Sequence, residues 1–131
     1  MKNNTPKTIF VIEDDQTMRS LLNTLLEIEG YNVTTFCDIG LSQFIKEIEF
    51  YKPNVILMDI HLKDFNGIEA LKTIRYTETI KNTCVLISSG EYLEVEAVKA
   101  GATGFLLKPY IPNDLLELIS TCIQKENNPI E

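Results

Sequence analysis

A run of four apolar residues, Val55 to Met58, ends in the single carboxylate of Asp59. The turn-forming residues Lys52, Pro53 and Asn54 precede this run. A short apolar run with such borders predicts a strand that is buried on both faces of a parallel sheet. Because open α/β sheets bind their ligands at the carboxyl ends of the strands, the strand should present Asp59 at such a site.

Strand and helix patterns alternate along the chain. Apolar and β-branched runs predict four more strands, at residues 8–12, 31–36, 83–88 and 103–107. Apolar residues at helical spacing predict five helices, which cover residues 18–25, 41–48, 68–74, 91–100 and 115–122. Strict alternation of this kind predicts an α/β fold: a doubly wound, five-stranded parallel sheet with helices on both faces and right-handed crossovers.

Single residues mark the predicted helix ends. Asp15 and Asp38 are placed to cap the first and second helices, because a carboxylate can accept the unpaired N–H groups of a first turn. Gly30 and Gly101 follow the ends of the first and fourth helices, where a left-handed residue is common.

Length and charge limit the classes of function. The chain has 131 residues, of which 44% are hydrophobic, and is expected to form a single domain with a core at residues 7–125 and short polar tails. A net charge of −7 argues against nucleic acid or an anionic membrane as a direct partner. The apolar run at residues 9–12 is too short for a signal peptide or a membrane span.

The three cysteines, Cys37, Cys84 and Cys122, lie far apart in the sequence. Their spacing suggests neither a complete disulfide framework nor a zinc site. A reducing cytosol, and hence a cytoplasmic location, is the expectation that follows.

Polar and charged residues follow or end four of the predicted strands, and in a parallel sheet these strand ends lie at one edge. The residues are Glu13 with Asp14, Asp59, Ser89 and Lys108. Clustered carboxylates repel one another unless a cation lies among them, and Mg²⁺ suits such oxygen ligands. An ionised Asp59 that attacks phosphorus would need this cation and Lys108 to neutralise the transferring oxygens, while Ser89 adds a hydroxyl donor. The product would be an acyl phosphate.

Each of these residues, taken alone, also has a purely structural explanation. Asp15 is better explained as a helix cap than as a metal ligand. Glu13 or Asp14 could be a solvated acid, and Lys108 could be a surface cation. His61, the only histidine, would be a surface residue, and Phe105 would be a core residue. Their joint placement at strand ends, where loops carry function, favours the site.

Four segments in order, residues 9–15, 55–59, 87–90 and 100–110, resemble the receiver domain of two-component response regulators. The resemblance covers nearly the whole chain, and Asp59 and Ser89 have the separation that the family leads us to expect. It implies a flavodoxin-like sheet with the strand order 2-1-3-4-5. Each motif is weak by itself, but all of them occur in order and each lies at a predicted strand end, and this joint placement supports the resemblance.

The resemblance implies a role for each matching residue. Asp59 would accept the phosphoryl group, and Mg²⁺ would be bound by Glu13, Asp14, Asp59 and the backbone carbonyl of His61. The switch residues would be Ser89, with Ser88 as the alternative, and Phe105. Lys108 would pair with the phosphoryl oxygens, and the bond before Pro109 would be cis.

The chain departs from the family in the loop after the acceptor. The family commonly has a proline and an aspartate where this chain has Lys63 and Asn66, although Gly67 is retained. His61 and Glu91 occupy variable positions that influence how long the phosphoryl group survives, so its lifetime cannot be deduced from the shared motifs.

The function that the resemblance implies is that of a signalling phosphoacceptor, not an enzyme that turns over external substrates. A sensor histidine kinase or a phosphotransfer protein would dock near the first helix and donate the phosphoryl group. The face formed by the fourth helix, fifth strand and fifth helix would then change its affinity for a downstream protein and could also form a homodimer. Both a stand-alone regulator and a receiver cut from a longer protein are open.

Three alternatives belong to other classes. A haloacid-dehalogenase-type phosphatase would need a second aspartate where His61 stands. A flavodoxin-like cofactor domain would need a phosphate-binding loop where the first predicted strand ends in acids. A degenerate receiver would keep the fold as an interaction module without phosphorylation, and the Lys63 and Asn66 departures are compatible with it.

Overall fold

The computed structural model describes residues 5–127 and forms one parallel sheet. Its strands are β1 (Thr8–Ile12), β2 (Asn32–Phe36), β3 (Val55–Asp59), β4 (Cys84–Ser89) and β5 (Gly104–Leu107). All neighbouring strands pair in parallel, in the order β2-β1-β3-β4-β5. The predicted fold class and strand order are therefore confirmed.

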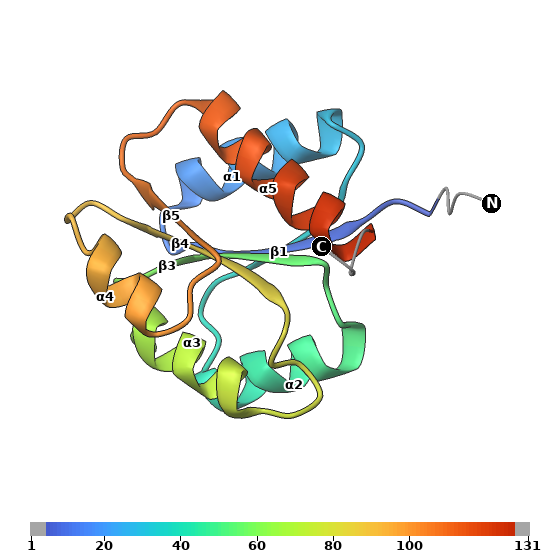
Figure 1. The fold of residues 1–131 in the computed structure, drawn as a ribbon. Helices are drawn as coiled ribbons and strands as arrows, with labels where there is room; N and C mark the ends of the chain where they lie inside the picture. Colours follow the sequence, from blue (N-terminus) through green and yellow to red (C-terminus); the bar gives the residue numbers. More distant parts are fainter. Residues whose placement is uncertain (1–4, 128–131) are drawn as a thin grey trace.

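Five helices cover the two faces of the sheet. They are α1 (Gln16–Ile28), α2 (Leu41–Tyr51), α3 (Gly67–Tyr76), α4 (Glu94–Lys99) and α5 (Pro112–Asn127). Helices α1 and α5 lie on one face, and α2, α3 and α4 lie on the other (Figure 1). The helix predicted at 91–100 is shorter than expected, and α5 extends through two residues, 126 and 127, of the predicted polar tail. Residues 1–4 and 128–131 of the predicted tails lie outside the described residues.

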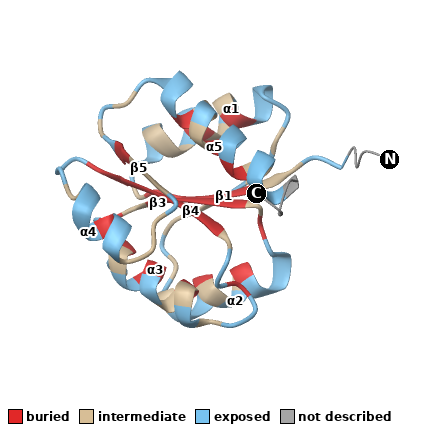
Figure 2. Cartoon of the chain, viewed as in Figure 1, coloured by how far each residue is buried: buried red, intermediate tan, exposed pale blue. Residues whose placement is uncertain are grey.

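The strands supply two hydrophobic cores because their side chains alternate between the faces. Phe10, Ile56 and Met58 pack toward α2, α3 and α4, whereas Val11 and Leu57 pack toward α1 and α5. The central strands are buried along nearly their whole length (Figure 2). The apolar run before Asp59 is therefore packed on both faces of the sheet, and this packing fixes the position of Asp59 at the end of β3.

Most predicted helix caps are present, with one exception. Asp15 Oδ1 accepts the N–H of Met18 at 2.8 Å, and Gly30 has φ +95 just beyond the end of α1. The predicted capping role of Asp38 is wrong: Asp38 has φ 54, and Gly40 is the residue that precedes α2. Asp38 lies two residues before this N-cap position, and its carboxylate forms an ion pair with Lys63 instead.

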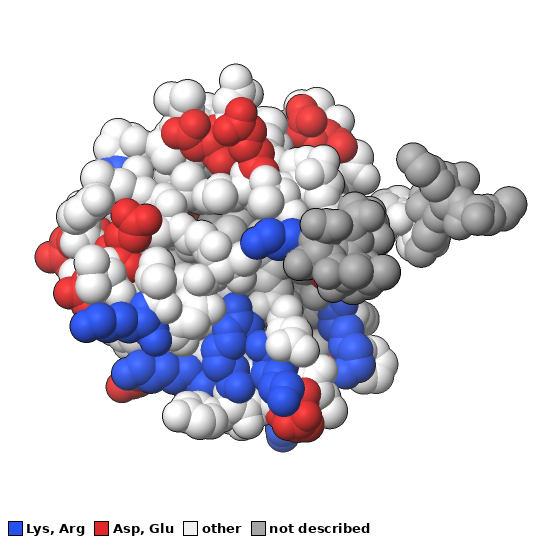
Figure 3. Space-filling model, in the orientation of Figure 1, with Lys and Arg blue, Asp and Glu red and all other residues white. Residues whose placement is uncertain are grey.

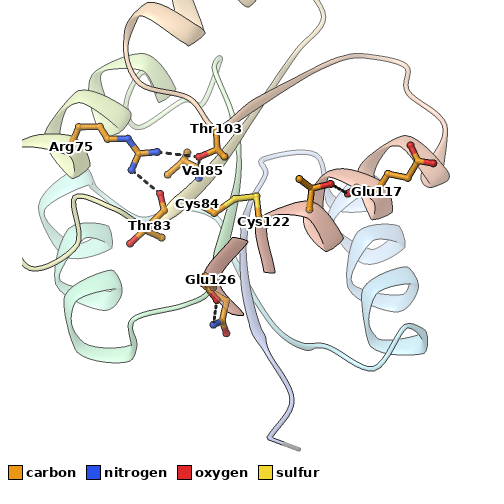
Figure 4. The surroundings of a disulfide bond; sticks show 10 residues. Arg75, Thr83, Cys84, Val85, Thr103, Glu117, Cys122 and Glu126 are labelled. Carbon is orange, nitrogen blue, oxygen red and sulfur yellow. Dashed lines mark hydrogen bonds between the residues drawn. A yellow bond between two sulfur atoms is a disulfide. The ribbon is translucent and has the colours of Figure 1, made fainter. Parts of the chain in front are cut away.

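Arg75 on α3 is hydrogen-bonded to the segments that precede β4 and β5, at the edge of the sheet where the strands begin. Its guanidinium donates to the carbonyls of Lys81, Thr83 and Gly101 at 2.7–2.9 Å and to the hydroxyl of Thr103 at 3.3 Å. Burial lowers the pKa of this half-buried group, but the ring of oxygen acceptors stabilises its charge. Figure 4 shows Arg75 between Thr83 and Thr103.

A disulfide joins Cys84 at the start of β4 to Cys122 on α5 (Figure 4). The spacing of the cysteines suggested no complete disulfide framework and did not predict this single pair, and Cys37 is the free cysteine of the described residues. Helix α5 runs back against the direction of the strands, so its last turns come beside the first residue of β4. Since disulfides are typical of oxidising compartments, this bond gives no support to the predicted cytoplasmic location.

Reduction of this disulfide is expected to lower the free energy of unfolding by about 2–4 kcal/mol, because the bond closes a long loop and restricts the unfolded chain. Urea unfolding of the wild type with and without dithiothreitol measures the change. A Cys84→Ser, Cys122→Ser double variant should be insensitive to the reductant, and Cys37→Ser should respond as the wild type does. Equal stability of the reduced and oxidised wild type would contradict the prediction.

Charge is unevenly distributed over the surface. In the view of Figure 3, Asp and Glu side chains gather over the α1/α5 layer, and Lys and Arg side chains form a band over the opposite layer. The surface thus has a basic region although the net charge of the chain is −7. The net charge alone therefore does not test the predicted absence of nucleic-acid partners, which stays a prediction. Among residues 5–127, no helix has the length and apolar character needed to cross a bilayer.

Candidate functional site

Lys108 connects the acidic residues at the carboxyl edge of the sheet. Its Nζ lies 3.0 Å from Glu13 Oε1 and 3.6 Å from Asp59 Oδ1. These atoms come from three separate strands, because Glu13 follows β1, Asp59 ends β3 and Lys108 follows β5. The side chains of Glu13, Asp59 and Lys108 are only 7%, 12% and 23% exposed. The sequence thus correctly predicted that these three residues meet.

The Asp59 carboxyl is only partly neutralised. Burial is the main cause that raises its pKa, and the Glu13 charge adds to the rise, although the charges of Lys108 and His61 act in the opposite direction. A half-buried carboxylate with one cation and a second carboxylate nearby is suited to receive a further positive charge or to act as a nucleophile.

The segment that carries Glu13 and Asp14 is fixed by hydrogen bonds on both sides. Glu13 Oε2 accepts the N–H of Asp15 at 3.0 Å. Arg19 of α1 donates from one nitrogen to the carbonyls of Glu13 and Asp14, at 2.7 and 3.2 Å. The sequence reasoning missed Arg19, which lies one helical turn after the cap residue Asp15 and can therefore reach back to the loop.

Ser89, Glu91 and His61 form a second connected group. The buried hydroxyl of Ser89 accepts the Glu91 N–H at 2.9 Å, and the Glu91 carboxylate lies 2.9 Å from His61 Nε2. The two loops that follow β3 and β4 are thus joined at the edge where Asp59 lies. Ser88 is paired with Asp59 in the sheet register, so both serines stay candidates for the switch hydroxyl.

Phe105 lies in β5 and is partly buried against the α2/α3/α4 core. The exposed ring of Tyr92 contacts it edge-on, with centroids 6.5 Å apart. The peptide bond between Lys108 and Pro109 is cis, as the resemblance implies. The switch role of Phe105 stays a prediction, and the structure adds Tyr92 as the residue that covers this ring.

The first turn of α3 approaches the backbone of Asp59. A Cβ atom at Gly67 would lie 2.5 Å from the carbonyl oxygen of Asp59 and 2.9 Å from Ile60 Cα, so only glycine fits. Asn66 caps α3, since its Oδ1 accepts the N–H groups of Ile68 and Glu69. The replacement of the usual aspartate by Asn66 therefore leaves the loop well defined.

The donor chemistry at this edge fits a hard cation such as Mg²⁺. Carboxylates come from Glu13, Asp14 and Asp59. A backbone carbonyl comes from His61, in the loop that follows Asp59. Within residues 5–127, however, no three such side chains are already arranged around one point. Glu13 and Asp14 are each held by N–H donors, so the predicted ligand set stays a prediction.

The fold and the edge site together define an open α/β domain with an acidic cluster and a lysine at the carboxyl ends of its strands. Residues 9–120 match the family described as the response regulator receiver domain, and this chain belongs to that family. The chain is 29% identical to the chemotaxis protein CheY of Thermotoga maritima, over 87% of this chain and 95% of that protein. The named relatives are signalling proteins and not classical enzymes.

Longer regulators and solved structures are also similar. A CpxR homologue of Haemophilus influenzae is 33% identical over 92% of this chain, but the chain spans only 52% of that transcriptional regulator. A solved chemotaxis response regulator of Vibrio cholerae is 25% identical and has a TM-score of 0.80, with 90% of this chain and 99% of that one covered. The chain therefore spans nearly all of the chemotaxis relatives but about half of the transcriptional regulators.

Proposed function

We propose that the domain accepts a phosphoryl group on Asp59 from a phosphohistidine of a sensor kinase or phosphotransfer protein. The observation that carries this proposal is the placement of the Lys108 ammonium between the carboxylates of Glu13 and Asp59 at the carboxyl edge of the sheet. An ionised oxygen of Asp59 forms a bond to phosphorus as the phosphorus–nitrogen bond breaks, and the departing imidazole takes a proton from water. The product is an aspartyl phosphate.

The chain's own residues would supply most of the surrounding chemistry. Lys108 already lies 3.6 Å from the Asp59 oxygen and would neutralise charge on the transferred group. The Ser89 hydroxyl, whose oxygen accepts the Glu91 N–H, would donate its own proton to a phosphoryl oxygen. Glu13, Asp14, Asp59 and the His61 carbonyl would hold Mg²⁺, which supplies further charge neutralisation when bound.

An apolar groove beside Lys108 is the docking surface that we propose for the phosphodonor. Its volume is about 390 Å³, and it lies between α1 and the segment after β5; its residues are Met18, Leu21, Leu22, Thr24, Leu25, Lys108, Pro109, Tyr110 and Pro112. Leu21 is 62% exposed and lies with other apolar side chains in this groove, and a contiguous apolar patch of this kind is typical of an interaction surface. Burial raises the pKa of Tyr110 to about 12, with Glu13 and Asp59 adding to the rise, so the phenol stays neutral. An amphipathic helix of the donor would bury this groove and bring its phosphohistidine beside Lys108.

Output would pass through the face of α4, β5 and α5. Movement of Ser89 toward a phosphoryl group would pull on the Glu91 loop before α4, while Phe105 would move relative to Tyr92. This face exposes Val95, Val98 and Leu107, which would contact a downstream protein or a second copy of the chain.

Intact mass after incubation with acetyl phosphate and Mg²⁺ tests the phosphoacceptor function. We expect the added mass of one phosphoryl group, its loss under mildly alkaline conditions as expected of an acyl phosphate, and no addition with EDTA. Peptide mapping should place the group on Asp59. A wild-type protein that gains no mass would overturn the proposal and favour a degenerate receiver that acts by contact alone.

A further inference from the structure

The loop between β3 and α3 is held at several points around the proposed metal ligands. His61 and Asn66 form an isolated antiparallel bridge across the loop, and the Phe65 ring stacks on Phe44 of α2 with centroids 5.9 Å apart. These contacts fix the two flanks of the loop. Lys63 lies between them, at the position where the resemblance led us to expect a proline.

Lys63 contacts two other loops at once. Its backbone N–H donates to Asp14 Oδ2 at 2.7 Å, a contact between residues 49 positions apart. Its side-chain ammonium forms an ion pair with the exposed carboxylate of Asp38 after β2. The pair lowers the pKa of Asp38 and raises that of Lys63, so both groups stay charged at neutral pH. The loops that follow β1, β2 and β3 therefore meet at Lys63.

We propose that Lys63 is a positioning residue for Asp14, through its backbone N–H and not through its charge alone. The hydrogen bond occupies Oδ2 and limits rotation of the Asp14 side chain, so that Oδ1 is the oxygen that Asp14 would offer to Mg²⁺. The Asp38 pair holds Lys63 at the loop surface. This inference rests on the proposed function, because it takes Asp14 as a Mg²⁺ ligand.

The side chain and the N–H of Lys63 can be tested separately. Lys63→Pro removes both, whereas Lys63→Ala removes only the ammonium and keeps the N–H. Loss of a group that orients a metal ligand typically costs about 10- to 100-fold in affinity. We therefore expect Lys63→Pro to weaken Mg²⁺ binding about tenfold or more, and Lys63→Ala to weaken it clearly less, since exposed ion pairs contribute little.

Mg²⁺ titration followed by amide chemical shifts measures these affinities without any phosphoryl transfer. Lys46→Ala, an exposed lysine of α2, is the matched control for loss of one positive charge. Equal affinity of Lys63→Pro and the wild type would overturn the inference, as would an equal loss in Lys63→Pro and Lys63→Ala. A wild type without saturable Mg²⁺ binding would overturn the metal part of the proposed function and this inference with it.

Hydrogen exchange gives a second test that needs no proline variant and no metal. In the metal-free wild type, the Lys63 amide should exchange slowly for an exposed loop residue, because Asp14 accepts its proton. In Asp14→Ala this amide should exchange at least several-fold faster, while the Gly67 amide, which donates to Ile60, should be unchanged. An unchanged Lys63 amide in Asp14→Ala would overturn the inference even if Lys63→Pro failed to fold.

Discussion

Replacing Asp59 by asparagine is expected to abolish phosphorylation by acetyl phosphate and, at neutral pH, to raise the melting temperature. An amide has no anionic oxygen to attack phosphorus, so the transfer should fall below detection. Stability should nevertheless rise, because the native protein holds the Asp59 charge in a half-buried position near Glu13. Asparagine keeps the shape of the side chain and removes this charge.

The pH dependence of the stabilisation follows from the raised pKa of Asp59. Stability contributed by the protonated carboxyl is fully present below the unfolded pKa of about 3.8 and is lost as pH rises through the higher folded pKa. The melting temperature of Asp59→Asn relative to the wild type should therefore increase over this pH range and then level off. Thermal unfolding monitored by circular dichroism measures this difference.

Asp64→Asn is the matched control for the Asp59 variant, since it removes an exposed carboxylate from the same loop. It should leave phosphorylation present and change stability little. Phosphorylation of Asp59→Asn at the wild-type level would contradict the proposed acceptor. A lower melting temperature of Asp59→Asn at neutral pH would show that the Lys108 contact outweighs burial and the Glu13 charge.

The fold was predictable because its signals are local and repeated. The run at Val55–Met58, with its turn-forming border, is typical of a strand buried on both faces, and the alternation of strands with amphipathic helices then favoured a parallel sheet. Helix α4 was the weakest prediction, because only Ala97 of its six residues is buried and tertiary contacts set its ends. Asp38 was misassigned because a left-handed backbone at a non-glycine residue has no clear local signal.

The candidate site was predictable to the extent that strand ends determine it. Glu13, Asp59 and Lys108 meet because parallel strands bring their carboxyl ends to one edge. The contacts of Arg19 and Lys63 were not predictable in the same way, since they depend on the paths of loops. The Cys84–Cys122 pair could have been found from topology, because the last helix of this fold runs back toward the start of β4.

Replacing Lys108 by alanine is expected to slow phosphorylation of Asp59 by about 100- to 1000-fold, the loss seen when one preorganised charge-stabilising donor is removed. Lys108 Nζ contacts both Glu13 and Asp59, so its removal leaves two half-buried carboxylates without their cation. The same variant should therefore be less stable at neutral pH. Initial rates with acetyl phosphate and saturating Mg²⁺, followed by intact mass, measure the kinetic effect.

Controls separate the transfer role of Lys108 from its role in folding. Lys72→Ala removes an exposed lysine of α3 and should keep the wild-type rate and stability. Adding Asp59→Asn to Lys108→Ala should recover stability without recovering transfer, because one of the two facing carboxylates is then neutral. A Lys108→Ala rate within threefold of the wild type would contradict the charge-stabilising role. A double variant no more stable than Lys108→Ala would show instead that the Glu13 pair, and not repulsion at Asp59, carries the structural contribution of Lys108.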